Sequence, residues 1–290
     1  MSLIELLQQN HILFLITIAV IGLSVGSFLN VVIYRIPVML EKEWAQQCRE
    51  LTEDAEPNEE ETFNLMLPGS QCPACKHKIT FWENIPILSY ILLKGRCSEC
   101  KQKISLRYPV IELATALLSI TVAWHFGLSW QTVFALLLTW ALIALSMIDY
   151  DHKLLPDNIV LPFLWLGLLI NINGVFIDLH SAVIGAIAGY LSLWSIFWLF
   201  KVITGKEGMG YGDFKLLALF GAWFGWQYLL LIVLLSSLVG AILGISLVLI
   251  FGRDRTIPIP FGPYLATAGW ISMLWGEEIN QTYLKLAGLG

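Results

Sequence analysis

Eight apolar runs, separated by polar segments, constrain the fold of this chain more than any other feature of its sequence. A run of about 20 apolar residues, when helical, crosses the hydrocarbon core of a bilayer, which is about 30 Å thick. Of the 290 residues, 57% are hydrophobic and only 13% are charged, which excludes an ordinary soluble domain. The runs are 12–33, 108–126, 131–148, 158–176, 181–200, 214–226, 227–251 and 261–276.

We therefore predict an all-α polytopic membrane protein with about eight transmembrane helices and the lipid bilayer as its surroundings. The sixth run, 214–226, is short for a full crossing, so its helix is either tilted or extended backwards through the preceding glycines. The net charge of −5 gives no reason to expect nucleic acid as a partner.

The basic residues predict the orientation of the chain. Of the 17 Lys and Arg residues, ten lie in the segment 34–107, and all but Lys285 lie in segments that face the same side. Cytoplasmic loops carry an excess of Lys and Arg. We therefore expect the large loop to be cytoplasmic and both chain termini to face outward.

Two carboxylates stand at the ends of apolar runs. Asp213 follows Gly208, Gly210 and Gly212 and opens the sixth run, while Asp149 closes the third. Charge is expensive near hydrocarbon, so an ionisable residue there indicates function. The orientation places both carboxylates at the cytoplasmic ends of their helices.

An aspartate pair at one depth of the membrane predicts an intramembrane aspartic protease. One ionised carboxylate takes a proton from a shared water, and the other, protonated, polarises the scissile carbonyl. The substrate-facing and active-site backbone positions are expected at Gly210, Gly212 and Lys215. The two glycines would let the backbone of the substrate approach closely. The alternative is a transporter with proton-relay aspartates and a structural zinc loop, but that reading leaves the glycines unexplained.

Other polar residues near these runs have less specific interpretations. Asp151 is expected to be a solvated loop residue, and Asp157 an N-cap or first-turn residue of the next helix. Glu112 is expected to form an ion pair with Arg107 or Lys215, or to contact a substrate. Asn30 is expected to hydrogen-bond to another helix.

Small residues recur at a spacing of four in several runs. The first pair, Gly22 and Gly26, forms a G-x-S-x-G pattern with Ser24. A serine nucleophile needs a strand–turn–helix context, which an apolar helix does not provide. The spacing therefore predicts close helix packing, as at Gly185/Gly189, Gly221/Gly225 and Gly240/Gly244.

Four cysteines in the large loop have the spacing of a zinc ribbon. Two C-x-x-C pairs are separated by 21 residues, and each pair can hold one side of a metal ion. Disulfides are the weaker interpretation because the cytoplasm keeps thiols reduced. We predict a structural zinc ion held by Cys72, Cys75, Cys97 and Cys100, with Cys48 left over.

Two further segments lie on the same expected face. Residues 41–61 carry nine carboxylates against Lys42 and Arg49, and such a density of charge predicts a solvated segment without a fixed fold. Three prolines and a glycine in 257–263 break the backbone at the entrance to the last run. Irregular backbone at that depth is tolerated where it is buried or lines a cavity.

These motifs resemble those of the type IV prepilin peptidases, a family of GxGD intramembrane aspartic proteases, from the first run to the last. The matching segments are Gly26–Val32, the two cysteine pairs, Arg107–Pro109 with Glu112, Asp149 with Pro156 and Asp157, Gly210–Lys215, and Pro258–Pro263.

The resemblance implies an activity that the residues alone do not. It implies cleavage of prepilins and pseudopilins after a glycine, followed by N-methylation of the new N-terminal residue. It also implies S-adenosylmethionine as a cofactor and a location in the bacterial inner membrane. The catalytic aspartates of the family fall on Asp149 and Asp213. Asn30, Gly95 and Glu112 are candidates for the methyl-donor site.

The expected domain organisation has four parts. Residues 1–33 form the first transmembrane helix, and residues 34–107 form a cytoplasmic loop domain with the acidic stretch and the Cys₄ site. Residues 108–276 form the transmembrane aspartic protease core, and residues 277–290 form a periplasmic tail.

Overall fold

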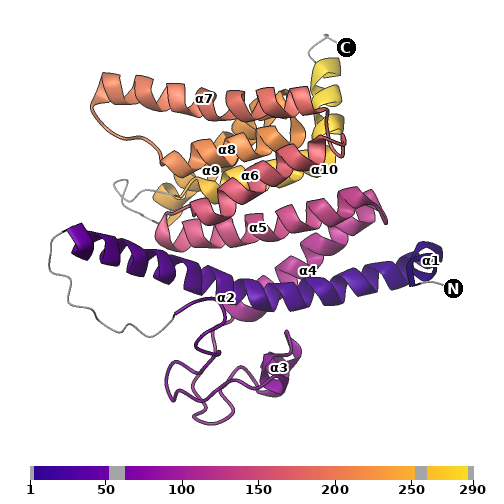
Figure 1. Cartoon of the computed structure of the whole chain (residues 1–290), viewed down its shortest axis with the longest axis vertical. Coiled ribbons are helices and arrows are strands. Elements are labelled where there is room, and N and C mark those ends of the chain that lie inside the picture. Colours follow the sequence, from indigo (N-terminus) through magenta and orange to yellow (C-terminus); the bar gives the residue numbers. More distant parts are fainter. Residues whose placement is uncertain (1–2, 52–62, 252–259, 287–290) are drawn as a thin grey trace. The chain divides into compact units, whose positions relative to one another are not determined.

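The computed structural model describes residues 3–51, 63–251 and 260–286. Its elements are helices, apart from the isolated bridges Gln71–Lys78 and Arg96–Lys103 within the described residues. The chain divides into two compact units, Met1–Leu128 and Ser129–Gly290. The prediction of an all-helical chain is confirmed, and every predicted run overlaps a helix (Figure 1). The run 158–176 is helical only to Asn171, however, and the helix of the run 261–276 continues to Leu286.

Five helices of the described residues are long and apolar enough to cross a membrane. They are α2 (His11–Leu51), α4 (Arg107–Phe126), α5 (Trp130–His152), α7 (Leu179–Thr204) and α9 (Leu229–Phe251), the last together with the preceding turn η2 (Trp226–Tyr228). The remaining predicted spans correspond to α6 (Asp157–Asn171), α8 (Tyr211–Phe224) and α10 (Gly262–Leu286).

The first unit is built on the packing of α4 against α2, and α1 (Leu3–Gln9) precedes α2. The two helices approach closely at Gly22 and Gly26. A Cβ atom at Gly26 would lie only 2.7 Å from the Cα atom of Glu112, and one at Gly22 only 2.9 Å from Cα of Ala116. The prediction that these glycines serve packing is therefore confirmed.

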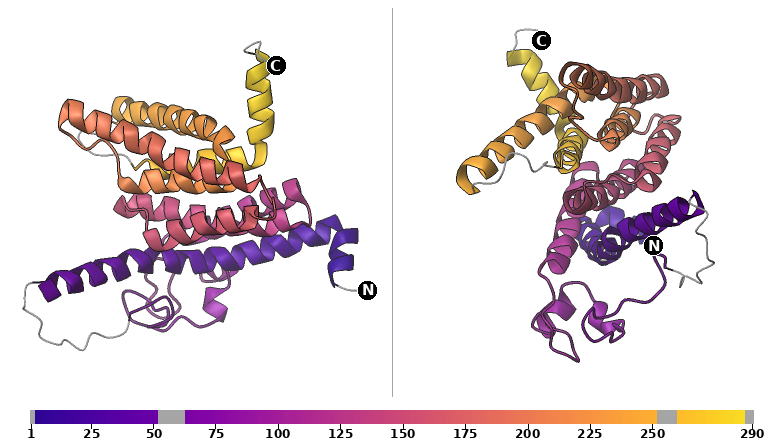
Figure 2. Two further views of the ribbon diagram at one scale, coloured as in Figure 1. Left: turned by 45° about the horizontal axis from the view of Figure 1, so that its top comes forward. Right: turned by 90° about the vertical axis from the view of Figure 1, so that its left-hand side faces the viewer.

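The helix α2 is longer than the sequence predicted. It does not end near residue 33 but continues through Pro37 to Leu51 as one unbroken helix (Figure 2). The expectation that 41–61 has no fixed fold is thus wrong for its first half, while residues 52–61 lie outside the described residues. Glu, Gln, Lys and Arg are good helix formers, and extending an existing helix avoids the cost of nucleation. The side chains of Gln46 and Glu50 also hydrogen-bond at 2.9 Å.

The cysteine loop is attached to α2 at Arg35. This side chain is buried, and its two terminal nitrogens donate to the backbone oxygens of Asn64 (2.7 Å) and Pro68. The guanidinium also lies over the ring of Phe63, with 5.5 Å to its centroid. Two short helices follow in the loop, η1 (Trp82–Asn84) and α3 (Leu88–Leu92).

The second unit surrounds α8. This helix packs along α7 on one side and α6 on another, and it also contacts α10 (Figure 1). Its residues from Leu216 to Phe224 are all buried. A helix that is apolar all round is expected to lie at the centre of its unit. Gly185 and Gly221 allow the contact with α7, because a Cβ atom at Gly221 would overlap the backbone of Gly185.

The helix α8 begins at Tyr211, three residues before the predicted run, and so includes Gly212 but not Gly208 or Gly210. With 14 residues it is about 21 Å long, still shorter than the hydrocarbon core. The break before α10 is described only from Pro260 onward. Of the three prolines of that segment, only Pro258 lies outside the described residues, and Pro263 is the second residue of α10.

Candidate functional site

Asp149 lies in the last turn of α5 and is only 6% exposed. The helix ends at Lys153, which adopts a left-handed conformation and donates its N–H to the carbonyl of Asp149. The carboxylate Oδ2 accepts a hydrogen bond of 2.9 Å from the backbone N–H of Gly262. The end of α5 and the start of α10 therefore meet at this carboxylate.

Asp213 lies in the first turn of α8 and is also 6% exposed. Negative charge is favoured there because the first N–H groups of a helix lack partners within it. The N–H of Asp213 donates to the carbonyl of Gly210 at 3.2 Å, and a Cβ atom at Gly210 would lie 3.8 Å from Oδ2 of Asp213. Leu155 lies against Gly212, the residue before Asp213, and against Gly262, whose N–H binds Asp149. The structure thus brings together the two aspartates that the sequence singled out.

Two glycines allow the backbone to pack closely around this pair of aspartates. A Cβ atom at Gly212 would lie 2.7 Å from Cβ of Leu155, and one at Gly262 would lie 2.6 Å from Oδ2 of Asp149. Leu155 is buried in the turn between α5 and α6 and contacts both glycine positions. Substitution of either glycine would displace Leu155 or a carboxylate.

Lys215 does not point freely toward a substrate. Its Nζ atom lies 2.7 Å from both carboxylate oxygens of Asp157. Asp157 is the first residue of α6, as predicted, so this ion pair connects the starts of α6 and α8. Asp151 is exposed, as expected of a solvated residue, but it lies in the last turn of α5, so the prediction that it belongs to a loop is wrong.

Sequence reasoning missed Gly262 and Leu155. The Pro-Phe-Gly-Pro segment marked a backbone break on the same expected face as the aspartates, but nothing local identifies the carboxylate that Gly262 contacts. Leu155 resembles any other apolar residue in the sequence. Its role depends on contacts with residues that are distant in the chain.

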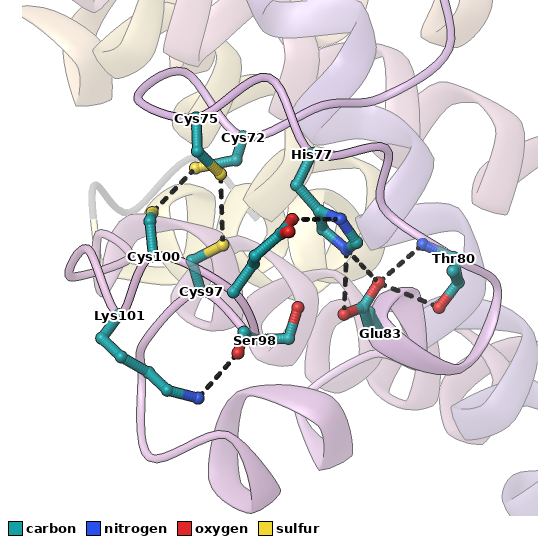
Figure 3. A network of polar contacts seen from close by, with 10 residues as sticks. Cys72, Cys75, His77, Thr80, Glu83, Cys97, Ser98, Cys100 and Lys101 are labelled. Atoms are coloured by element: carbon teal, nitrogen blue, oxygen red, sulfur yellow. Dashed lines mark hydrogen bonds and ion pairs between the residues drawn. The ribbon is translucent and has the colours of Figure 1, made fainter.

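The four cysteines of the loop come together as predicted (Figure 3). Their sulfur atoms all lie within 4.8 Å of one another, with 3.7 Å between Cys72 and Cys100 and 3.9 Å between Cys75 and Cys97. A tetrahedral zinc site with Zn–S bonds of about 2.3 Å requires sulfur atoms about 3.8 Å apart. The four thiols therefore fit zinc.

Each cysteine pair forms a turn whose N–H groups point at a sulfur. The backbone N–H groups of Cys75 and Ala74 lower the pKa of Cys72 to about 6. Those of Cys100 and Glu99 lower the pKa of Cys97 in the same way. The turns thus stabilise the thiolates of Cys72 and Cys97, the form of cysteine that binds metals, whereas burial and the neighbouring cysteines raise the pKa of Cys75 to about 12.

A second layer of polar residues supports the cysteine turns (Figure 3). His77 contacts Glu99 through Nδ1 at 2.9 Å and Glu83 through Nε2 at 3.2 Å. Glu83 also accepts from the N–H and the hydroxyl of Thr80. Hydrogen bonds from the Ser98 hydroxyl and from Thr80 lower the pKa of Glu83 to about 2, and the bond to Glu83 raises that of His77.

The three candidates for the methyl-donor site all have partners in the first unit. Asn30 donates to the backbone oxygens of Gly26 (3.2 Å) and Tyr108 (3.3 Å), which confirms the expected bond to another helix. Glu112 was expected to form an ion pair with Arg107 or Lys215. Its carboxylate accepts a hydrogen bond of 2.7 Å from the N–H of Ile87, while Lys215 pairs with Asp157. Gly95 has a positive φ of 66°.

The position of Gly95 has a local explanation. A Cβ atom there would lie 2.7 Å from the hydroxyl of Tyr90 in α3. Glycine adopts positive φ without the steric penalty that other residues incur. The conformation of the loop therefore accounts for this residue, and its role toward a methyl donor stays a prediction.

Comparison with known proteins identifies relatives along the whole chain. Residues 20–126 match the family described as Bacterial Peptidase A24 N-terminal domain, and residues 136–245 match the Type IV leader peptidase family. The chain is 57% identical over 290 residues to a Prepilin leader peptidase/N-methyltransferase of Stutzerimonas stutzeri, covering 100% of both chains. No solved structure matches the chain significantly.

Two further relatives carry the same description. The protein from Pseudomonas aeruginosa is 58% identical over 289 residues, or 99% of each chain. The protein from Legionella pneumophila is 47% identical over 269 residues, covering 93% of this chain and 94% of that protein.

Proposed function

The chain belongs to the peptidase A24 family of type IV leader peptidases, and we propose that Asp149 and Asp213 form the catalytic pair with which it removes the leaders of prepilins and pseudopilins. We further propose that it then methylates the new N-terminal residue, as the description of its relatives states. Membership of this family removes the reason for the transporter alternative.

One observation carries the assignment of the catalytic pair. Two buried carboxylates from helices far apart in the sequence lie in one narrow region, because Leu155 contacts both Gly212, the neighbour of Asp213, and Gly262, whose N–H binds Asp149. Two carboxyl groups in this situation do not ionise together easily, so they share a proton. Such a pair supplies both an acid and a base for the attack of water on a peptide bond.

The contacts of Asp149 divide the roles of its two oxygens. The N–H of Gly262 occupies Oδ2, which leaves Oδ1 to hold the attacking water and accept its proton. We propose that Gly210 and Gly212, at the start of α8, border the path of the substrate backbone. Lys215 affects the site indirectly, by positioning the start of α8, because its ammonium group is already bound by Asp157.

The membrane arrangement that we propose has eight crossings, with both termini outward and the cysteine loop in the cytoplasm. The five candidate spans account for part of it, and α6, α8 and α10 supply the rest. In the inner membrane of a bacterium, this orientation would put the aspartate pair at the cytoplasmic boundary. The protease core would then include 108–276, and 277–290 would form the periplasmic tail.

The cysteine cluster would hold zinc as a structural ion. Four thiolates fill its coordination sphere and leave no position for a reacting water. S-adenosylmethionine would supply the methyl group for the second reaction. For its site we retain Asn30, Gly95 and Glu112 as candidates, although each also has a structural role.

A single reaction tests the proposed function. The purified protein is incubated with a synthetic prepilin segment and S-adenosylmethionine, and the products are followed by mass spectrometry. We expect loss of the leader and then the gain of one methyl group, with cleavage alone when the donor is omitted. Substrate that stays intact under both conditions would refute the proposal.

A further inference from the structure

The segment Phe81–Leu92 of the cysteine loop exposes an unusual number of large apolar side chains. Its only charged residue is Glu83, which is held by Thr80 and His77. Five of its side chains are between 50% and 78% exposed, namely Phe81, Trp82, Leu88, Ile91 and Leu92. A soluble domain rarely leaves so many apolar groups uncovered, and contiguous apolar surface marks an interaction site.

The depth of this segment is fixed by its bond to α4. The N–H of Ile87, the residue before α3, donates to Oε2 of Glu112 at 2.7 Å. Glu112 is the sixth residue of α4, so its Cα lies about 7.5 Å along the helix from Arg107. The 20 residues of α4 are about 30 Å long, so nearly the whole helix is needed to cross the hydrocarbon core.

A contact with α2 gives a second measure of this depth. The hydroxyl of Ser27 also hydrogen-bonds to Glu112, and Gly26 packs against the Cα of Glu112. Both residues lie inside the apolar run 12–33, more than a turn before its cytoplasmic end. The proposed membrane arrangement therefore puts Glu112 below the membrane surface on both helices. The start of α3 lies beside it, although the sequence places α3 in a soluble loop.

We propose that Phe81–Leu92 inserts into the cytoplasmic leaflet of the bilayer and covers its apolar side chains with lipid. The aromatic rings of Phe81 and Trp82 suit the interfacial layer, where Trp is enriched. Leu88, Ile91 and Leu92 reach the outer part of the hydrocarbon. Glu112 is the positioning residue that holds the segment at this depth.

The charges around the segment complement an anionic lipid surface. Residues 76–107 contain seven Lys and Arg residues against two glutamates, and five of the seven follow the apolar segment. Both glutamates contact His77. Basic residues near the membrane are attracted to anionic headgroups. The loop thus has an apolar segment for the leaflet and basic residues for the headgroups.

A photoreactive amino acid tests this placement without relying on enzymatic activity. It is introduced separately at Ile91, at Leu117 midway along α4, and at Gln46 on the exposed polar extension of α2. Each variant is reconstituted in phosphatidylglycerol vesicles, illuminated and examined for lipid adducts by mass spectrometry. Elution as the unmodified protein on size exclusion establishes that each variant is folded.

We expect Ile91 to form lipid adducts at a level close to that of Leu117 and several-fold above that of Gln46. Adducts at Ile91 no more frequent than at Gln46, or crosslinks from Ile91 to other parts of the protein in place of lipid, would overturn the proposal. A second variant, Glu112→Gln, keeps an acceptor for the Ile87 N–H and should retain the adducts. Glu112→Leu removes the acceptor and should reduce them.

Discussion

The backbone N–H of Gly262 lies 2.9 Å from Oδ2 of Asp149 and joins the start of α10 to the end of α5. The two residues are 113 positions apart in the chain. Because a side chain at Gly262 would occupy the place of the carboxylate, the position has a direct bearing on catalysis.

Gly262→Ala should impair cleavage without unfolding the protein. The added methyl group would displace Asp149 or Leu155, and a displacement of about 1 Å at a catalytic group can cost about 10²-fold in rate. We expect this loss in kcat, with little change in KM. Gly69→Ala is the matched control, because a Cβ atom there would meet nothing within 4 Å. Equal activity of the two variants would contradict a role for Gly262.

The ion pair of Lys215 and Asp157 can either position the start of α8 or leave Lys215 to bind the substrate, and two substitutions distinguish these roles. If the pair positions the start of α8, then Lys215→Met and Asp157→Asn should lower kcat to similar degrees. The double variant should then be no worse than either single one. An increase in KM for Lys215→Met alone would show that Lys215 binds the substrate instead. The effect on stability should be small, about 0.2–1 kcal/mol, because the pair is partly exposed.

The cysteine cluster should contain a single zinc ion per chain. Cys72→Ser removes one ligand and should release the metal and destabilise the loop, because metal binding contributes directly to the folding of small sites. Cys48→Ser, outside the cluster, should retain zinc. Metal analysis of protein purified under reducing conditions checks both, and absence of zinc from the unmodified protein would refute the prediction. In the Cys72→Ser variant, the rate of cleavage should fall less than the rate of methylation.

The features that sequence could predict depend on local properties. The apolar runs became helices because hydrophobicity along a run is sufficient to specify a helix in a membrane. The C-x-x-C spacing likewise determined which cysteines meet. The contact of Gly262 with Asp149 and the pairing of Lys215 with Asp157 depend on tertiary packing, which no local pattern encodes. The extension of α2 was missed because helix propensity outweighed charge repulsion.

The exposed carboxylates of that extension should affect the rate at which substrate arrives. Glu41, Glu43 and Glu50 are exposed on α2, and such charges attract a basic peptide over about 8–10 Å at physiological salt. Their replacement by Gln should lower kcat/KM for a synthetic substrate with a Lys-rich leader, most clearly at low salt. A substrate with Gln in place of those lysines is the control. A kcat/KM that does not change at any salt concentration would exclude attraction of the leader.

The central claim is that Asp149 and Asp213 perform the cleavage, and the most direct test is a single-turnover assay of three Asp→Asn variants. The amide cannot transfer a proton, so Asp149→Asn and Asp213→Asn should each reduce cleavage by about 10²–10⁴-fold. Both variants should still methylate a substrate that has already been cleaved, which shows that they are folded. Asp151→Asn makes the same change at an exposed position two residues from Asp149 and should cleave normally. Normal cleavage by the Asp149 or Asp213 variant, or loss of cleavage in the Asp151 variant alone, would contradict the account.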